Sequence, residues 1–140
     1  MDLAQKIVNK MIDGDAFSQW LGIEVLDIHT GFCKLQMKVR PEMLNGFNIA
    51  HGGISFSLAD SALAFAANSD GIQSLSVETT ISHTKKVMAG DILIAETEEI
   101  SKNNKIASYN ITIKNQNNKE VAHFKGRVFR TQRHWFSKKK

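Results

Sequence analysis

The sequence predicts an α+β fold in which an antiparallel sheet wraps around one long helix. Residues 53–68 are apolar on almost every side, which is typical of a helix buried on most of its faces. Short alternating stretches bounded by turn residues precede and follow this helix, and they indicate antiparallel strands. Because these strands do not alternate with helices, α+β is favoured over α/β. The 140 residues suffice for one core, so we expect residues 1–140 to form a single domain.

The chain is expected to begin with a short amphipathic helix within residues 1–14. Gly14 and Asp15 then interrupt the pattern, and a second apolar turn follows. We expect both segments to pack against the body of the domain. The apolar face of the first comprises Leu3, Ile7, Met11 and Ile12, and that of the second comprises Phe17, Trp20 and Leu21.

Residues 22–29 and 31–40 are predicted to form a β-hairpin with its turn at Thr30 and Gly31. The second strand alternates cleanly and ends at Pro41, the single proline. With one cysteine, the chain has no intrachain disulfide, and we expect that cysteine to be packed in the core. The residues expected to face inward are Cys33, Leu35, Met37 and Val39.

After the long helix, alternating segments separated by polar turns predict an antiparallel meander. Gly71 is free to take a left-handed conformation where the helix stops. A turn at Gly90 and Asp91 is expected to join the first two strands, and residues 132–140 are expected to be a basic tail. The expected strands are 74–86, 92–100, 106–114 and 120–131, with Ala107, Tyr109, Ile111 and Ile113 on one side of the third.

Composition excludes several classes of protein. The net charge of +4 owes much to the lysines at 138–140, and the nearly balanced remainder argues against a nucleic-acid surface. No apolar run could span a bilayer and no signal peptide is evident, so we expect a cytoplasmic protein. The chain has no G-x-S-x-G elbow, no metal-ligand spacing of histidines and no glycine pattern for a dinucleotide or phosphate loop. We therefore expect neither a metal nor a cofactor.

Asp60 stands in the middle of the apolar helix, where a charge is costly. It is either a structural carboxylate satisfied by hydroxyls and backbone donors, or a functional one that acts as a base or nucleophile. His51, Gly52 and Gly53 precede the helix. The glycines either permit tight entry of the helix or allow its free N–H groups to approach a developing oxyanion.

Gly52 and Asp60 are separated by ~12 Å along a helix. A single chain cannot bring both to one carbonyl carbon. Two chains can, if their long helices lie antiparallel about a twofold axis. If both features are catalytic, the protein is at least a homodimer with shared sites.

The motif formed by these residues resembles that of the hotdog-fold acyl-CoA thioesterases, and most of all the phenylacetic acid degradation thioesterase family. The likeness rests on Asn45, the His51-Gly52-Gly53 block and Ser57 to Asp60, with 64–66, 68–69, 89–91 and 121–126 in support, and it covers roughly residues 15–131. It implies a hydrolase that cleaves an acyl-CoA, of the phenylacetyl type in phenylacetate degradation, to free acid and CoA. It further implies that coenzyme A enters only as part of the substrate and that the assembly is a homotetramer, a dimer of dimers.

The resemblance also implies roles for individual residues. Asp60 would activate water or attack the thioester directly, and the Gly52 N–H of the partner subunit would polarise the carbonyl. Asn45 and His51 would shape the pocket and orient the thioester and the water. Gly53 would let the backbone come close to the bound ligand.

Residues of the strand after the helix complete the expected site. Ser76 matches a water-positioning hydroxyl in some relatives, and Thr80 is expected on the same strand face as a substitute. Many relatives carry an Arg-Pro pair where this chain has Lys85 and Lys86, so the positive charge is kept and the proline is lost. These lysines could meet CoA phosphates or be solvated, and His83 could contact the ligand or pack in the strand.

Two other functions remain open. One is a hydratase or dehydratase of the same fold, which would use His51 and Asp60, although such relatives place the histidine in a proline-bearing loop. The other is a non-catalytic acyl-CoA binding module, which would have no use for a buried carboxylate beside the thioester. Thioester cleavage measured against hydration of an enoyl-CoA separates these functions.

Overall fold

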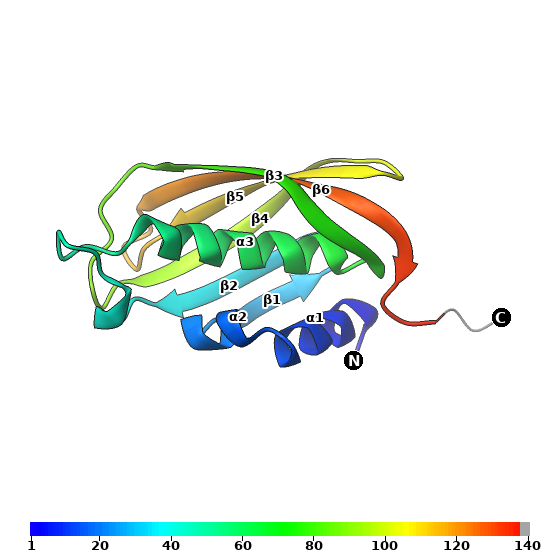
Figure 1. The fold of residues 1–140 in the computed structure, drawn as a ribbon, viewed down its shortest axis with the longest axis horizontal. Helices are drawn as coiled ribbons and strands as arrows, with labels where there is room; N and C mark the ends of the chain where they lie inside the picture. The colour runs from blue at the N-terminus through cyan, green and yellow to red at the C-terminus, as the bar shows by residue number, and fades with distance from the viewer. Residues whose placement is uncertain (138–140) are drawn as a thin grey trace.

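The computed structural model describes residues 1–137, in which one long helix lies across one face of a curved sheet (Figure 1). This confirms the expected α+β hotdog architecture. The sheet has six strands, all neighbours are antiparallel, and their order is β1-β2-β4-β5-β6-β3. Within the described residues the elements are α1 (Leu3–Asp13), α2 (Ala16–Leu21), β1 (Glu24–His29), β2 (Phe32–Lys38), the 3-10 turn η1 (Pro41–Met43), α3 (Gly52–Asn68), β3 (Ile72–His83), β4 (Ile92–Lys102), β5 (Ile106–Lys114) and β6 (Glu120–His134).

The predicted meander is right for β4, β5 and β6 and wrong for β3. β3 pairs with β6 and forms the far edge of the sheet, whereas β4 lies between β2 and β5. Gly90 and Asp91 therefore do not join neighbouring strands. Instead, residues 84–91 cross past the start of α3, where the Ala50 N–H donates to the Val87 carbonyl (2.7 Å). This crossover lets strands from both halves of the chain cover the helix.

The ends of two strands also differ from the prediction. β3 stops at His83 because the N–H groups of Thr84 and Lys85 both turn to the Val121 carbonyl. β6 continues to His134, so the first three residues of the expected basic tail belong to the sheet. The lysines at 138–140 lie outside the described residues.

α3 is buried on most sides, as its composition predicts. Its C-terminal turn ends at Asn68, and Gly71 takes a positive φ of 103° shortly after. The inward face of β2 is also confirmed, and burial raises the pKa of the Cys33 thiol, which makes it a packing residue. No helix in the described part of the chain is long and apolar enough to cross a bilayer. The fully buried side chains around the helix include Leu35, Met37, Leu58, Leu63, Phe65, Leu93, Tyr109, Ile111 and Phe124.

The N-terminal helices pack against the core, as expected, with Ile7 buried and Met11 and Ile12 partly buried. In α1 the buried residues are Ala4, Ile7 and Val8, and Leu3 is 47% exposed, because the helix packs on a slightly rotated face. In α2 the core receives Leu21 and the small Ser18, since a helix of six residues offers only one narrow face. Of the expected apolar turn, Leu21 is fully buried, whereas Phe17 and Trp20 are about half exposed and stack on each other.

Candidate active site

Most of the candidate residues line one of two cavities at different points along α3. The first, of about 390 Å³, lies at the start of the helix. It brings together five of the residues singled out by sequence, which come from the loop before α3, the helix itself, and the end of β3 with its following loop. They are Asn45, Gly52, His83, Lys85 and Lys86.

The first turn of α3 presents one free backbone donor to this cavity. His51 caps the helix, and its Nδ1 accepts the Gly53 N–H at 2.9 Å. The Ile54 N–H donates to the His51 carbonyl at 2.8 Å. Among the described residues no acceptor is found for the Gly52 N–H, and Gly52 is an exposed residue at the positive end of the helix dipole. Of the two glycines, Gly52 can thus donate to a ligand, and Gly53 serves the cap.

Little room remains between Gly52 and β3. A Cβ at Gly52 would come within 3.2 Å of the Nε2 of His83. His83 is the last residue of β3, so the register of that strand sets the position of its ring beside the helix start. The structure therefore places His83 beside the free donor, where it can contact a ligand.

Asn45 organises the loop that leads into α3 and keeps a donor for the cavity. Its Oδ1 accepts the N–H groups of Phe47 (2.9 Å) and Ile49 (3.4 Å). Its Nδ2 has no partner among the described residues. Lys85 and Lys86 also line this cavity, are exposed, and form no ion pair within the described part of the chain. An anionic group at the mouth of the cavity would meet both lysines.

The second cavity, of about 270 Å³, holds Asp60 in mostly apolar surroundings. Burial raises the pKa of the half-buried Asp60 carboxyl, and the nearby charge of Asp15 raises that pKa further. No described residue donates a hydrogen bond that offsets these two effects. The cavity is lined by Met11, Asp60, Leu63, Ala64, Asn68, Ser74, Leu75, Ser76, Val128 and Trp135.

A bulge in β3 separates Ser76 from Thr80. Ser76 pairs with Val128 and Glu78 pairs with Arg127, so Val77 is the extra residue. Ser76 consequently lines the Asp60 cavity, whereas Thr80 lines a different cavity with Glu78 and Arg127. The expectation that the two hydroxyls share a strand face is wrong, because the bulge reverses the alternation.

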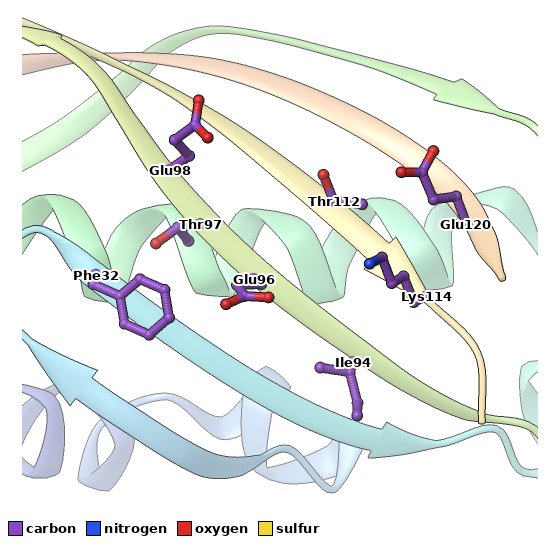
Figure 2. A pocket seen from close by; sticks show the side chains of 8 residues that line it. All are labelled: Phe32, Ile94, Glu96, Thr97, Glu98, Thr112, Lys114 and Glu120. Carbon is purple, nitrogen blue, oxygen red and sulfur yellow. The ribbon is translucent and has the colours of Figure 1, made fainter. Parts of the chain in front are cut away.

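The outer face of the sheet carries a further groove of about 380 Å³, which runs over β2, β4, β5 and β6 (Figure 2). It contains none of the residues that the sequence singles out as site candidates. The groove is lined by Phe32, Ile94, Glu96, Thr97, Glu98, Thr112, Lys114 and Glu120.

Sequence reasoning did not connect three residues with Asp60, namely Asp15, Asn68 and Trp135. Asp15 caps α2 by accepting the Ser18 N–H (2.9 Å) and the Ser18 hydroxyl (2.6 Å), and Ser18 in turn is 2.8 Å from the hydroxyl of Ser61 on α3. An aspartate before an apolar run signals a helix cap, but nothing local links it to Asp60. Asn68 and Trp135 reach the same cavity from the end of α3 and from beyond β6.

Comparison with known proteins identifies the family. The model of the thioesterase superfamily matches residues 47–122. The acyl-coenzyme A thioesterase PaaI of Escherichia coli is 38% identical over 120 residues, which is 86% of each chain. The structure of the E. coli PaaI protein from the phenylacetic acid degradation operon superposes with a TM-score of 0.91 at 36% identity, covering 94% of this chain and 95% of that one. A variant of the phenylacetic acid degradation protein PaaI from Thermus thermophilus superposes with a TM-score of 0.81 at 32% identity, covering 84% of this chain and all of that one. The chain is thus a hotdog-fold enzyme of the thioesterase superfamily.

Proposed function

We propose that the protein hydrolyses acyl-CoA thioesters to a free acid and CoA at sites shared between two subunits. The observation that carries this proposal is the pairing of an unused donor with an unpaired carboxylate on one helix. The Gly52 N–H and the Asp60 carboxylate line separate cavities and lie ~12 Å apart along α3. Each feature therefore needs the other from a partner chain.

The edge of the sheet offers a surface for that partner. β3 is an edge strand of twelve residues, and its Leu75 and Val77 are 66% and 59% exposed. A long apolar edge favours pairing with another strand. Asp60 and Ala64 share a cavity with Leu75, so pairing of two β3 edges about a twofold axis would also bring the two α3 helices together. This makes a homodimer the smallest active unit, and we propose a tetramer built from two such dimers.

In the proposed reaction, a water oxygen attacks the thioester carbonyl carbon while Asp60 takes a proton from that water. The carbonyl oxygen gains negative charge, which the partner's Gly52 N–H stabilises. Collapse of the intermediate breaks the carbon–sulfur bond, and the CoA thiolate leaves and takes up the proton that Asp60 holds, which regenerates the carboxylate. Its raised pKa makes the Asp60 carboxylate a stronger base. Ser76 is suited to hold the water.

The other cavity residues have roles that fit binding. The Nδ2 of Asn45 can donate to the thioester, and His51 holds the helix start in place. Lys85 and Lys86 can meet the CoA phosphates as point charges. For the acyl group we propose an arylacetyl unit such as phenylacetyl. An apolar cavity of about 150 Å³ holds benzene, so the 270 Å³ beside Asp60 has room for an aromatic ring and its methylene.

Release of CoA thiol from a panel of acyl-CoAs tests this function. The panel comprises phenylacetyl-, hydroxyphenylacetyl- and benzoyl-CoA and a series of straight-chain esters. We expect hydrolysis by the wild type and a loss of at least about a hundredfold in Asp60→Asn, with a smaller loss in Asn45→Ala, because Asn45 only positions groups. Hydration of an enoyl-CoA without thioester cleavage would instead establish the hydratase. Ligand binding with neither reaction would establish the binding module.

Mixed subunits test the shared site. Asp60→Asn and Gly52→Ala chains, produced together, form some dimers in which one of the two sites has wild-type Asp60 and a wild-type partner Gly52. Random mixing should restore about a quarter of wild-type activity. Activity no higher than the mean of the two variants made separately would show that each site lies within one chain.

A further inference from the structure

Trp135 lines the cavity that holds Asp60. This residue is the first after β6, and its backbone N–H donates to the Gly71 carbonyl at 3.0 Å. Its indole Nε1–H donates to the Oδ1 of Asn68 at 2.8 Å. Two hydrogen bonds thus hold the residue against the end of α3, with its ring on the cavity wall.

Asn68 is itself locked in place. It is 2% exposed, and its Oδ1 also accepts the Ser74 N–H at 2.8 Å. Its Nδ2 donates to the Ala64 carbonyl (2.8 Å) and to the Ser74 carbonyl (3.1 Å). Movement of the indole away from Asn68 would remove one partner from a buried, fully used amide, which is unfavourable. The wall formed by Trp135 is therefore rigid.

The spacing of residues along α3 sets the distance between Trp135, which is hydrogen-bonded to Asn68, and Asp60. Asp60, Ala64 and Asn68 are spaced by four residues, so they lie along one face of α3, and all three line the cavity. Asp60 and Asn68 are ~12 Å apart along the helix axis. An acyl group whose carbonyl lies beside Asp60 would extend along this face toward the indole, with Met11 at its side.

We propose that Trp135 sets the upper length of the acyl group that this enzyme accepts, by blocking the far end of the acyl cavity. This inference rests on the proposed thioesterase function. The indole leaves space for an arylacetyl or short-chain acyl group and excludes longer straight chains. Since one methylene in an apolar pocket changes kcat/KM by about 10-fold or more, a fixed wall produces a sharp limit.

The test compares Trp135→Ala with two controls across straight-chain acyl-CoAs and phenylacetyl-CoA. We expect Trp135→Ala to raise kcat/KM for the longest chains, relative to phenylacetyl-CoA, by at least about tenfold. Trp135→Phe keeps most of the wall, so its length limit should stay close to that of the wild type. Phe136→Ala removes the neighbouring aromatic ring, which packs by Lys10 and does not line the cavity, and should leave the profile unchanged.

The outcomes separate the two proposals. If the wild type hydrolyses no acyl-CoA, the proposed function fails. If hydrolysis persists in Trp135→Ala with an unchanged length profile, the role of Trp135 is refuted.

A second measurement decides the matter should Trp135→Ala not fold. The chain has two tryptophans, so Trp20→Phe leaves Trp135 as the sole indole emitter. Its fluorescence should change when phenylacetate binds as product. Product inhibition by phenylacetate without any change in that fluorescence would overturn the proposal.

Discussion

Gly52→Ala should make the protein slightly more stable and much less active. The φ of Gly52 is not in the left-handed region, so alanine fits its backbone. Alanine is favoured over glycine by about 1 kcal/mol within a helix, and we expect about half of that in the first turn. The new methyl would be 3.2 Å from the Nε2 of His83, an exposed side chain that can yield by a few tenths of an ångström. We therefore expect a rise in melting temperature of about 2 °C.

The activity should change in the opposite direction. The methyl would fill the gap between Gly52 and His83, beside the free N–H, and would displace the thioester oxygen from that donor. Loss of one such donor costs about 100- to 1,000-fold in kcat, and we expect a loss near the lower figure. The assays are thermal unfolding and CoA release from phenylacetyl-CoA.

Gly46→Ala is the matched control for this change. Gly46 lies in the loop before α3, a Cβ there would meet no atom within 4 Å, and both measurements should stay at wild-type values. Full activity of a folded Gly52→Ala protein would refute the role of the Gly52 N–H. A parallel fall in stability and activity would instead point to damage of the helix start.

Three further substitutions probe the carboxylate and the packing around α3. Asp15→Asn removes a charge that raises the pKa of Asp60 but keeps the cap of α2. The acid limb of the profile of kcat/KM against pH should therefore move to lower pH. An unmoved limb would mean that the two carboxylates do not interact. Asp60→Asn should stabilise the protein at neutral pH. The pKa of the Asp60 carboxyl is raised above 3.8 in the folded protein, so the protonated carboxyl favours folding, and this stabilisation is lost as the pH rises through the folded-state pKa. Asparagine carries no charge and avoids that loss. The difference in melting temperature between Asp60→Asn and the wild type should shrink as the pH falls toward 3.8. Identical melting temperatures of the two proteins at neutral pH would contradict the raised pKa of Asp60. Gly126→Ala would place a Cβ 2.5 Å from the Cδ2 of Leu63, so we expect the free energy of unfolding to fall by about 1–3 kcal/mol. The melting temperature should drop clearly, whereas that of Gly46→Ala should not change. Wild-type stability of Gly126→Ala would show that Leu63 can repack.

Local sequence patterns were sufficient to predict the main helices and strands, and to single out Asp60 and the two glycines as site residues. The alternation of 31–40 identified the buried face of β2, and the apolar run identified α3 as the central helix. The carboxylate of Asp60 and the paired glycines at the start of α3 were apparent from local sequence as well. A charge within an apolar run and two adjacent glycines at a helix start are anomalies that neighbours in the sequence reveal.

Tertiary structure alone decided the partners of these elements. Strand order places β3 at the edge, and one extra residue at Val77 turns Thr80 away from Ser76. The meeting of Asp15 with Asp60, and of Trp135 with Asn68, joins segments far apart in the chain. Periods of two and 3.6 residues follow from the local backbone geometry of strands and helices, so they appear in the sequence. Strand pairing and cavity walls depend on long-range packing that no local pattern records.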